Sequence, residues 1–127
     1  MGKLPVLRKN NDFRRVYSKG KYASSESLVV YFIKNREDTV RVGITTSKKV
    51  GKIVKRNRMR RLVRENIRLL YERLVPGIDL VIVVRKADPG ANLHSIGKEL
   101  KYLLKKLDIL VREKNHEGTA DTDDQGL

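Results

Sequence analysis

The residues Ile78–Val84 form a near-continuous apolar run with the length of a β-strand. Turn-forming residues bound the run, Pro76–Gly77 before it and Asp88–Gly90 after it. Successive side chains of a strand point to opposite faces of the sheet, so a strand that is apolar at nearly every position needs cover on both faces. The run is too short for a membrane span, which takes about 20 residues. It therefore predicts a strand with protein packed on both of its faces.

A short helix is predicted near the start of the chain. Phe13, Val16 and Tyr17 follow the i, i+3, i+4 spacing of one helix face. Residues 10–12, Asn-Asn-Asp, are of the types that cap helix N-termini, and Gly20 can end the helix in a left-handed conformation.

Two further strands are predicted before the middle of the chain. Ser27–Ile33 is rich in β-branched and aromatic residues, and both of its faces are apolar enough to be partly covered. Thr39–Thr46 alternates, with Val40, Val42 and Ile44 on one face. The polar residues 34–38 between them suggest a hairpin loop.

Two longer helices complete the pattern, at about Ile53–Val75 and about Leu93–Arg112. The apolar stripe of the first comprises Met59, Leu62, Val63, Ile67, Leu70 and Leu74, and that of the second Leu93, Ile96, Leu100, Leu103, Leu104, Leu107 and Val111. The order helix–strand–strand–helix–strand–helix, with room for an extra short strand, predicts an α+β or α/β two-layer sandwich. Its one sheet is mixed, because the strand–helix–strand unit over residues 39–84 implies a parallel pair.

The charge of the 127-residue chain is uneven. The net charge of +14 divides into +18 for residues 1–112 and −4 for residues 113–127. We expect residues 1–112 to form a single domain and residues 113–127 to be a disordered acidic tail, which either competes weakly for the basic surface or is an inert end. The chain has no cysteine, no signal-peptide pattern and no membrane span, so we expect a cytoplasmic protein that makes no membrane contact. A body this basic favours a polyanionic partner.

Residues Lys48–Arg68 carry ten bases and one acid, Glu65. Arg56, Arg60, Arg64 and Arg68 recur every four residues, on the side of the predicted helix away from the apolar stripe. A solvated helix face is one interpretation, but solvated faces usually interleave acids and bases. Guanidinium groups grip phosphates with paired hydrogen bonds, so the pattern favours a nucleic-acid interface.

The basic stretch also carries a resemblance to a known family. Thr46–Gly51 (TSKKVG), followed by Lys55–Glu65 (KRNRMRRLVRE), resembles the bacterial ribonuclease P protein family and its arginine–asparagine–arginine signature. The agreement extends from about residue 7 to about residue 110, through Asn11–Phe13, Val30–Tyr31 and Ile78–Lys86. The resemblance implies a left-handed strand–helix–strand crossover. It also implies that the protein assists a catalytic RNA, which removes the 5′ leader of precursor tRNA with Mg²⁺ ions.

The resemblance assigns roles to two groups of residues. The group expected to bind the catalytic RNA comprises Lys49, Lys52, Lys55, Arg56, Asn57, Arg58, Arg60, Arg61, Arg64 and Arg68. The group expected to bind the single-stranded leader in a cleft comprises Phe13, Tyr17, Tyr31, Lys48, Arg85 and Lys86. Aromatic rings in a basic groove hold single-stranded RNA by stacking, which is consistent with these roles, although such rings also serve as core residues.

Catalysis by the protein itself is not expected. His94 and His116 are the only histidines, and the second lies in the acidic tail, whereas paired-histidine nucleases need both to be rigidly held. The acids of the body are scattered singly, so neither a bound metal nor a cofactor is predicted in the protein. The main alternative is a ribosomal or ribosome-assembly protein, which would need the basic face but no leader groove. A DNA-binding protein is disfavoured, because no two-helix reading unit is present.

Overall fold

Four strands form one mixed sheet in the order β1-β2-β4-β3, and three helices pack on it. The structure, a computed structural model, describes residues 4–111, and the expectations for the acidic tail fall outside these residues. The elements are α1 (Asn10–Lys19), β1 (Lys21–Ser24), β2 (Leu28–Lys34), β3 (Arg41–Thr46), the 3₁₀ turn η1 (Lys48–Val50), α2 (Ile53–Leu70), the 3₁₀ turn η2 (Tyr71–Arg73), β4 (Ile78–Val84) and α3 (Leu93–Lys106).

Strand β4 is covered on both of its faces, as its apolar run predicts, and it lies inside the sheet. It pairs antiparallel with β2 and parallel with β3, so the predicted parallel pair is β3 and β4. The predicted hairpin through residues 34–38 is wrong, because β4 lies between β2 and β3. Strands β2 and β4 take the two interior positions of the sheet, whereas β3 and the short β1 form the edges. The left-handed crossover stays a prediction.

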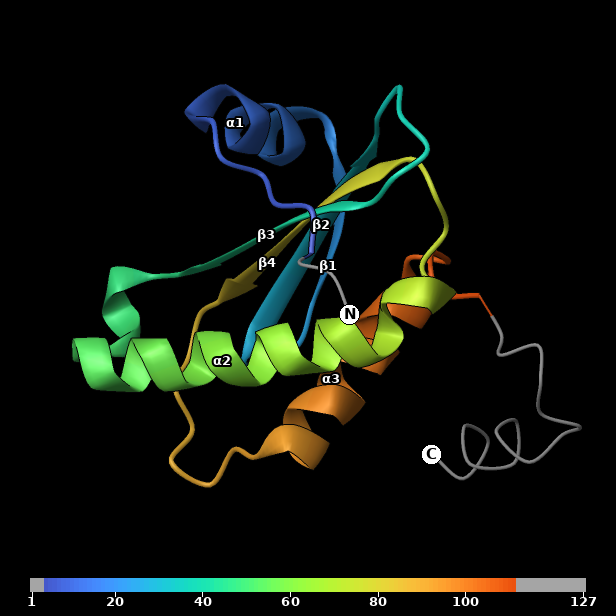
Figure 1. The fold of residues 1–127 in the computed structure, drawn as a ribbon. Helices are drawn as coiled ribbons and strands as arrows, with labels where there is room; N and C mark the ends of the chain where they lie inside the picture. Colours follow the sequence, from blue (N-terminus) through green and yellow to red (C-terminus); the bar gives the residue numbers. More distant parts are fainter. Residues whose placement is uncertain (1–3, 112–127) are drawn as a thin grey trace, which may run out of the picture.

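The helices form unequal layers on the two faces of the sheet (Figure 1). Helices α2 and α3 pack under one face, where Leu80, Ile82 and Val84 of β4 join the main core. Helix α1 lies on the other face, where Val16 packs with Leu7 and Val81 in a smaller cluster. This two-sided cover is what the apolar run of β4 requires.

Both long helices end earlier than their apolar stripes suggest. The chain leaves α2 at Leu70 through a 3₁₀ turn, since Val75 precedes a proline and its N–H donates to the carbonyl of Ile109 instead. Helix α3 ends at Lys106, because Asp108 adopts a left-handed conformation with φ of 61° and turns the chain back. The two ends of the α3 stripe, Leu93 and Val111, are exposed rather than buried.

The ends of α1 also differ from expectation. The N-cap residue is Lys9, which makes no side-chain cap, and residues 10–12 lie within the first helical turn. Gly20 is extended rather than left-handed, because it leads directly into β1. A Cβ atom at Gly20 would lie 2.5 Å from the backbone oxygens of both Phe32 and Val16, so glycine permits this close approach. Within residues 4–111 no helix has the length and apolar character needed to cross a membrane.

Candidate nucleic-acid interface

Four aromatic side chains lie next to one another on the α1 face of the sheet. Helix α1 contributes Phe13 and Tyr17, whose ring centroids are 6.4 Å apart. Tyr17 meets Tyr31 of β2 edge to face at 5.0 Å, and Tyr31 meets Tyr22 of β1 at 5.5 Å. We call Phe13, Tyr17, Tyr31 and Tyr22 the aromatic row. Three of them are the residues that the sequence predicts for the leader-binding site.

The sheet register explains why the aromatic row crosses several strands. Tyr22 is paired with Tyr31, Tyr31 with Val81, and Val81 with Gly43, so these four positions form one line across the sheet. Phe13 covers the end of this line, because a Cβ atom at Gly43 would lie only 2.6 Å from its ring. Tyr17 follows Phe13 on the same face of α1 and contacts Tyr31, so the row returns to β2.

The rings of the row differ in how far they reach solvent. Tyr17 is 42% exposed and Tyr22 is 65% exposed, whereas Phe13 and Tyr31 are half-buried. None of these four rings is fully buried, so part of each ring can contact another molecule. Partial burial, together with the neighbouring Tyr31, raises the pKa of Tyr17. Like any tyrosine, it can donate a hydrogen bond from its phenol at neutral pH.

Tyr22 is the member of the row that the sequence does not reveal. It lies in β1, which has only four residues and was expected only as an extra short strand without a position. A strand of four residues is too short to show a clear alternation in the sequence, so no sequence signal places Tyr22 beside Tyr31.

The cations predicted for the leader-binding site gather at one end of the same sheet. Strands β3 and β4 are parallel neighbours, so the segments that follow them leave the sheet side by side. Lys48 lies just after β3 and both Arg85 and Lys86 just after β4, and all three are exposed. We call these three residues the basic end. Between the basic end and the aromatic row lie the half-buried side chains of Thr45, Val83 and Val29.

Two residues of the basic end already have partners. Lys86 forms an ion pair with Glu26 at 2.9 Å, which raises the pKa of its ammonium group. Arg85 donates to the backbone carbonyls of Ser25 and Glu26. A guanidinium group has five N–H donors, so these bonds leave others available to a ligand.

Helix α2 presents most of its arginines to the outside, as the sequence predicts. Arg61, Arg64 and Arg68 are exposed, as are Lys49, Lys52, Lys55 and Asn57 around them, whereas Arg56 is half-buried. We call Arg60, Arg61, Arg64 and Arg68 the arginine face. Glu65 pairs with Arg68 at 3.7 Å, and no acid within residues 4–111 forms an ion pair with the other three.

Arg60 is the innermost residue of the arginine face. It is half-buried, and it donates to the Thr46 hydroxyl at 3.1 Å and to the side chain of Asn57. These contacts join α2 to the end of β3.

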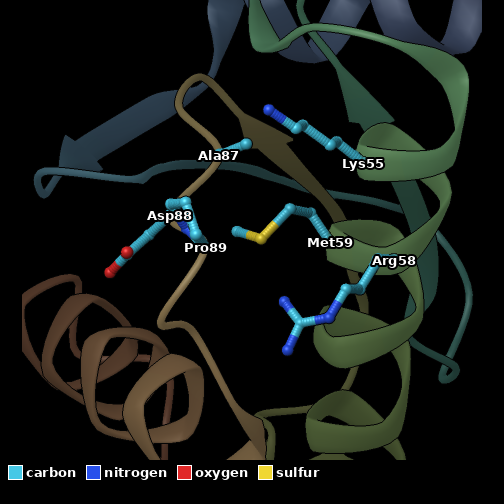
Figure 2. Close-up of a pocket in the computed structure, with 6 residues that line it drawn as sticks. All are labelled: Lys55, Arg58, Met59, Ala87, Asp88 and Pro89. Atoms are coloured by element: carbon cyan, nitrogen blue, oxygen red, sulfur yellow. The ribbon is translucent and has the colours of Figure 1, made fainter.

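Arg58 points away from the arginine face. Figure 2 shows its guanidinium directed toward the loop after β4, beside a pocket lined by Lys55, Met59 and Ala87–Pro89. Its Nη2 atom donates to the carbonyl oxygen of Ala91 at 2.6 Å. Arg58 therefore fastens α2 to this loop, and the structure does not group it with the other arginines.

A groove connects the arginine face with the start of the aromatic row. Its lining includes Arg64 and Arg68 of α2, Phe13 of α1, Gly43 of β3 and Arg8. Two surfaces that the sequence predicts separately, one for each RNA, are thus continuous at this edge of the sheet. Within residues 4–111 no group of three or more histidine or acidic side chains is arranged to hold a metal ion.

The fold and these surfaces define a class: a small basic α+β protein with a mixed four-stranded sheet, an exposed arginine helix and exposed aromatic rings. The ribonuclease P family model matches residues 1–108. The chain is 45% identical over 106 residues to the ribonuclease P protein component of Clostridioides difficile, covering 83% of this chain and 93% of that one. It is 44% identical to the ribonuclease P protein component of Clostridium kluyveri, covering 79% of this chain and 91% of that one.

Solved structures agree with these matches. The RNase P protein of Staphylococcus aureus superposes with a TM-score of 0.76 at 31% identity, covering 85% of this chain and 99% of that one. The RNase P protein of Thermotoga maritima has a TM-score of 0.69 at 30% identity, covering 80% of this chain and 96% of that one. The chain therefore belongs to the ribonuclease P family, as a protein component of the bacterial type. Membership implies that the chain is part of an endoribonuclease complex with ribonuclease P RNA as its partner. The same matches favour this family over a ribosomal or ribosome-assembly protein.

Proposed function

We propose that the protein binds the catalytic RNA of ribonuclease P through α2 and the single-stranded 5′ leader of precursor tRNA across the α1 face of the sheet. The RNA with its Mg²⁺ ions cleaves the phosphodiester bond, and the protein increases the affinity for substrate. In this proposal the protein acts as a cytoplasmic monomer within the complex.

One observation carries the assignment of the leader to the sheet face. The aromatic row lies on the α1 face and the basic end lies at one end of the same sheet, with the half-buried side chains of Thr45, Val83 and Val29 between them. Single-stranded RNA is held by base stacking on aromatic rings together with cations along its backbone, and each stacked base contributes about 1–3 kcal/mol. Exposed rings together with nearby cations match these requirements. A surface that recognises duplex RNA by its shape would not need exposed rings for base stacking.

The arginine face is assigned to the catalytic RNA on electrostatic grounds. Arg60, Arg61 and Arg64 have no carboxylate partner within residues 4–111, so like charges repel one another in the free protein. Phosphates of a large structured RNA relieve this repulsion and accept paired hydrogen bonds from each guanidinium.

Reconstitution tests the proposal. Purified protein is mixed with a bacterial ribonuclease P RNA at low Mg²⁺ concentration, and cleavage of precursor tRNA is followed alongside binding of precursor and mature tRNA. We expect cleavage that neither component gives alone, and tighter binding of the leader-bearing RNA than of mature tRNA.

Tyr17→Ala provides the specific test of the sheet face, with Tyr102→Ala on α3 as a control exposed to a similar degree. Tyr17→Ala should weaken binding of precursor tRNA by about 5- to 100-fold, the loss of one stacked base, and leave mature tRNA unaffected. An equal loss for both RNAs, or an equal effect of the control, would contradict the assignment of the leader to this face.

A further inference from the structure

The turn between β1 and β2, residues 25–27, is anchored to α3 by one carboxylate. Glu99 of α3 accepts hydrogen bonds from the Ser25 hydroxyl at 2.5 Å and from the Ser27 backbone N–H at 3.1 Å. Ser27 is only 4% exposed, so its N–H needs an acceptor within the protein. Glu99 supplies this acceptor and fixes both ends of the turn.

The same turn holds the two basic residues that follow β4. The Arg85 guanidinium donates to the carbonyls of Ser25 and Glu26, and its backbone N–H donates to the carbonyl of Ser27 at 2.9 Å. The Lys86 ammonium lies 2.9 Å from the Glu26 carboxylate. These four contacts all run through residues 25–27, the same turn that Glu99 holds.

We propose that Glu99 is a positioning residue for the RNA leader, acting through this turn on Arg85 and Lys86; the inference rests on the proposed role of the basic end. Glu99 holds the turn, and the turn carbonyls fix the direction of the Arg85 guanidinium. The guanidinium donors that the turn does not use remain for a leader phosphate. A side chain that is already oriented loses less conformational freedom when the phosphate binds.

The chemistry of Glu99 provides a conservative variant. Glu99→Gln keeps a side-chain oxygen that can accept from both Ser25 and Ser27, whereas Glu99→Ala removes the acceptor. Lys98→Ala changes the exposed neighbour of Glu99 on α3 and serves as the matched control.

Binding of precursor and mature tRNA to the reconstituted complex is measured for each variant, after thermal unfolding has shown that the variant is folded. We expect Glu99→Ala to weaken binding of leader-bearing RNA by about tenfold, as for the loss of one well-placed charged hydrogen bond, and to leave mature tRNA unchanged. Glu99→Gln should restore most of the affinity for leader-bearing RNA that Glu99→Ala loses. Lys98→Ala should leave that affinity unchanged. Should Glu99→Ala unfold, Ser25→Ala removes one of the two contacts and carries the same expectation.

A double variant tests whether Glu99 acts through Arg85. If it does, Glu99→Ala causes no further loss in a protein that already carries Arg85→Ala. Equal weakening of both RNAs by Glu99→Ala, or full additivity with Arg85→Ala, would overturn the inference. Failure of the proposed function looks different, because the unaltered protein would then not distinguish precursor from mature tRNA.

Discussion

Asp79 shows how one buried side chain joins three elements. It lies in β4 with no exposed surface and binds Arg41 of β3 at 2.8 Å, Arg15 of α1 at 3.0 Å and Asn35 at 2.9 Å. Burial alone would raise the pKa of this carboxyl, but the hydrogen bonds from Arg41, Asn35 and Arg15 outweigh burial and lower it. Asp79 therefore stays ionised and fixes α1, with its aromatic residues, to the sheet.

This arrangement predicts a pH-dependent contribution to stability. A carboxyl whose pKa is lower in the folded than in the unfolded protein stabilises the fold at neutral pH, and this contribution is lost as the pH falls through the folded pKa. Asp79→Asn should lower the free energy of unfolding at pH 7 by roughly 3 kcal/mol, the low end for breaking a buried pair, because both guanidiniums reach solvent. Urea unfolding at pH 7 and in acid checks this. The prediction is contradicted if Asp79→Asn lowers the free energy of unfolding by the same amount in acid as at pH 7.

Gly43 determines where Phe13 lies. A Cβ atom at Gly43 would come within 2.6 Å of the Phe13 ring, so the ring would have to shift from its place against β3. Gly43→Ala should therefore lower the free energy of unfolding by about 1–3 kcal/mol through overpacking. Gly90→Ala is the control, since its Cβ atom would meet nothing closer than 3.5 Å. If urea unfolding gave both variants the same stability, the close packing of Phe13 on Gly43 would be disproved.

At the scale of the element, α2 has two differently placed sides besides its buried stripe. Arg64 is exposed on the side that lines the groove with Phe13, whereas Arg58 reaches the carbonyl of Ala91 on the other side. Arginines that look equivalent in the basic stretch therefore have different neighbours, because their positions along the helix place them on different sides of it.

A pair of variants separates these roles. Arg64→Ala should weaken binding of the catalytic RNA and leave the melting temperature unchanged, since the side chain contacts solvent. Arg58→Ala should instead lower the free energy of unfolding by about 0.5–1.5 kcal/mol through the lost hydrogen bond to Ala91. RNA-binding titrations and thermal unfolding of both variants provide the check. A lower melting temperature for Arg64→Ala would show that its role is structural.

At the scale of the whole molecule, the distribution of charge favours a polyanionic partner. Arg64 and Arg68 of the arginine face line the groove together with Arg8, and the basic end follows β3 and β4. Residues 1–112 carry +18, far more than solubility requires. A surface of this kind gains affinity by releasing counterions from RNA.

We therefore predict a steep salt dependence for binding of the catalytic RNA. If about six to ten phosphates are neutralised, affinity should fall by roughly 10³–10⁵ between 50 and 200 mM salt. Titrations at several salt concentrations give the slope of log K against log salt. A flat slope would exclude the basic surface as the main RNA contact.

Much of the fold could be predicted from local patterns. The apolar run of β4, the alternation of β3 and the stripe of α2 depend on the side-chain period of each element, which is a property of neighbouring residues. The exposed arginines of α2 follow from the same period, because the buried stripe leaves only the opposite side for them. Family membership was likewise evident from residues 46–65, whose spacing is a linear motif.

Tertiary structure alone decided the rest, since those features join residues far apart in the chain. The position of β4 between β2 and β3 overturned the expected hairpin, and the ends of α2 and α3 were set by the Val75–Ile109 pairing and the turn at Asp108. The anchoring of Asp79 by three elements and the contact of Glu99 with residue 25 likewise have no periodic signature. The spacing of apolar residues in the sequence determines which side of a helix or strand is buried. Only tertiary packing determines which other element that side contacts.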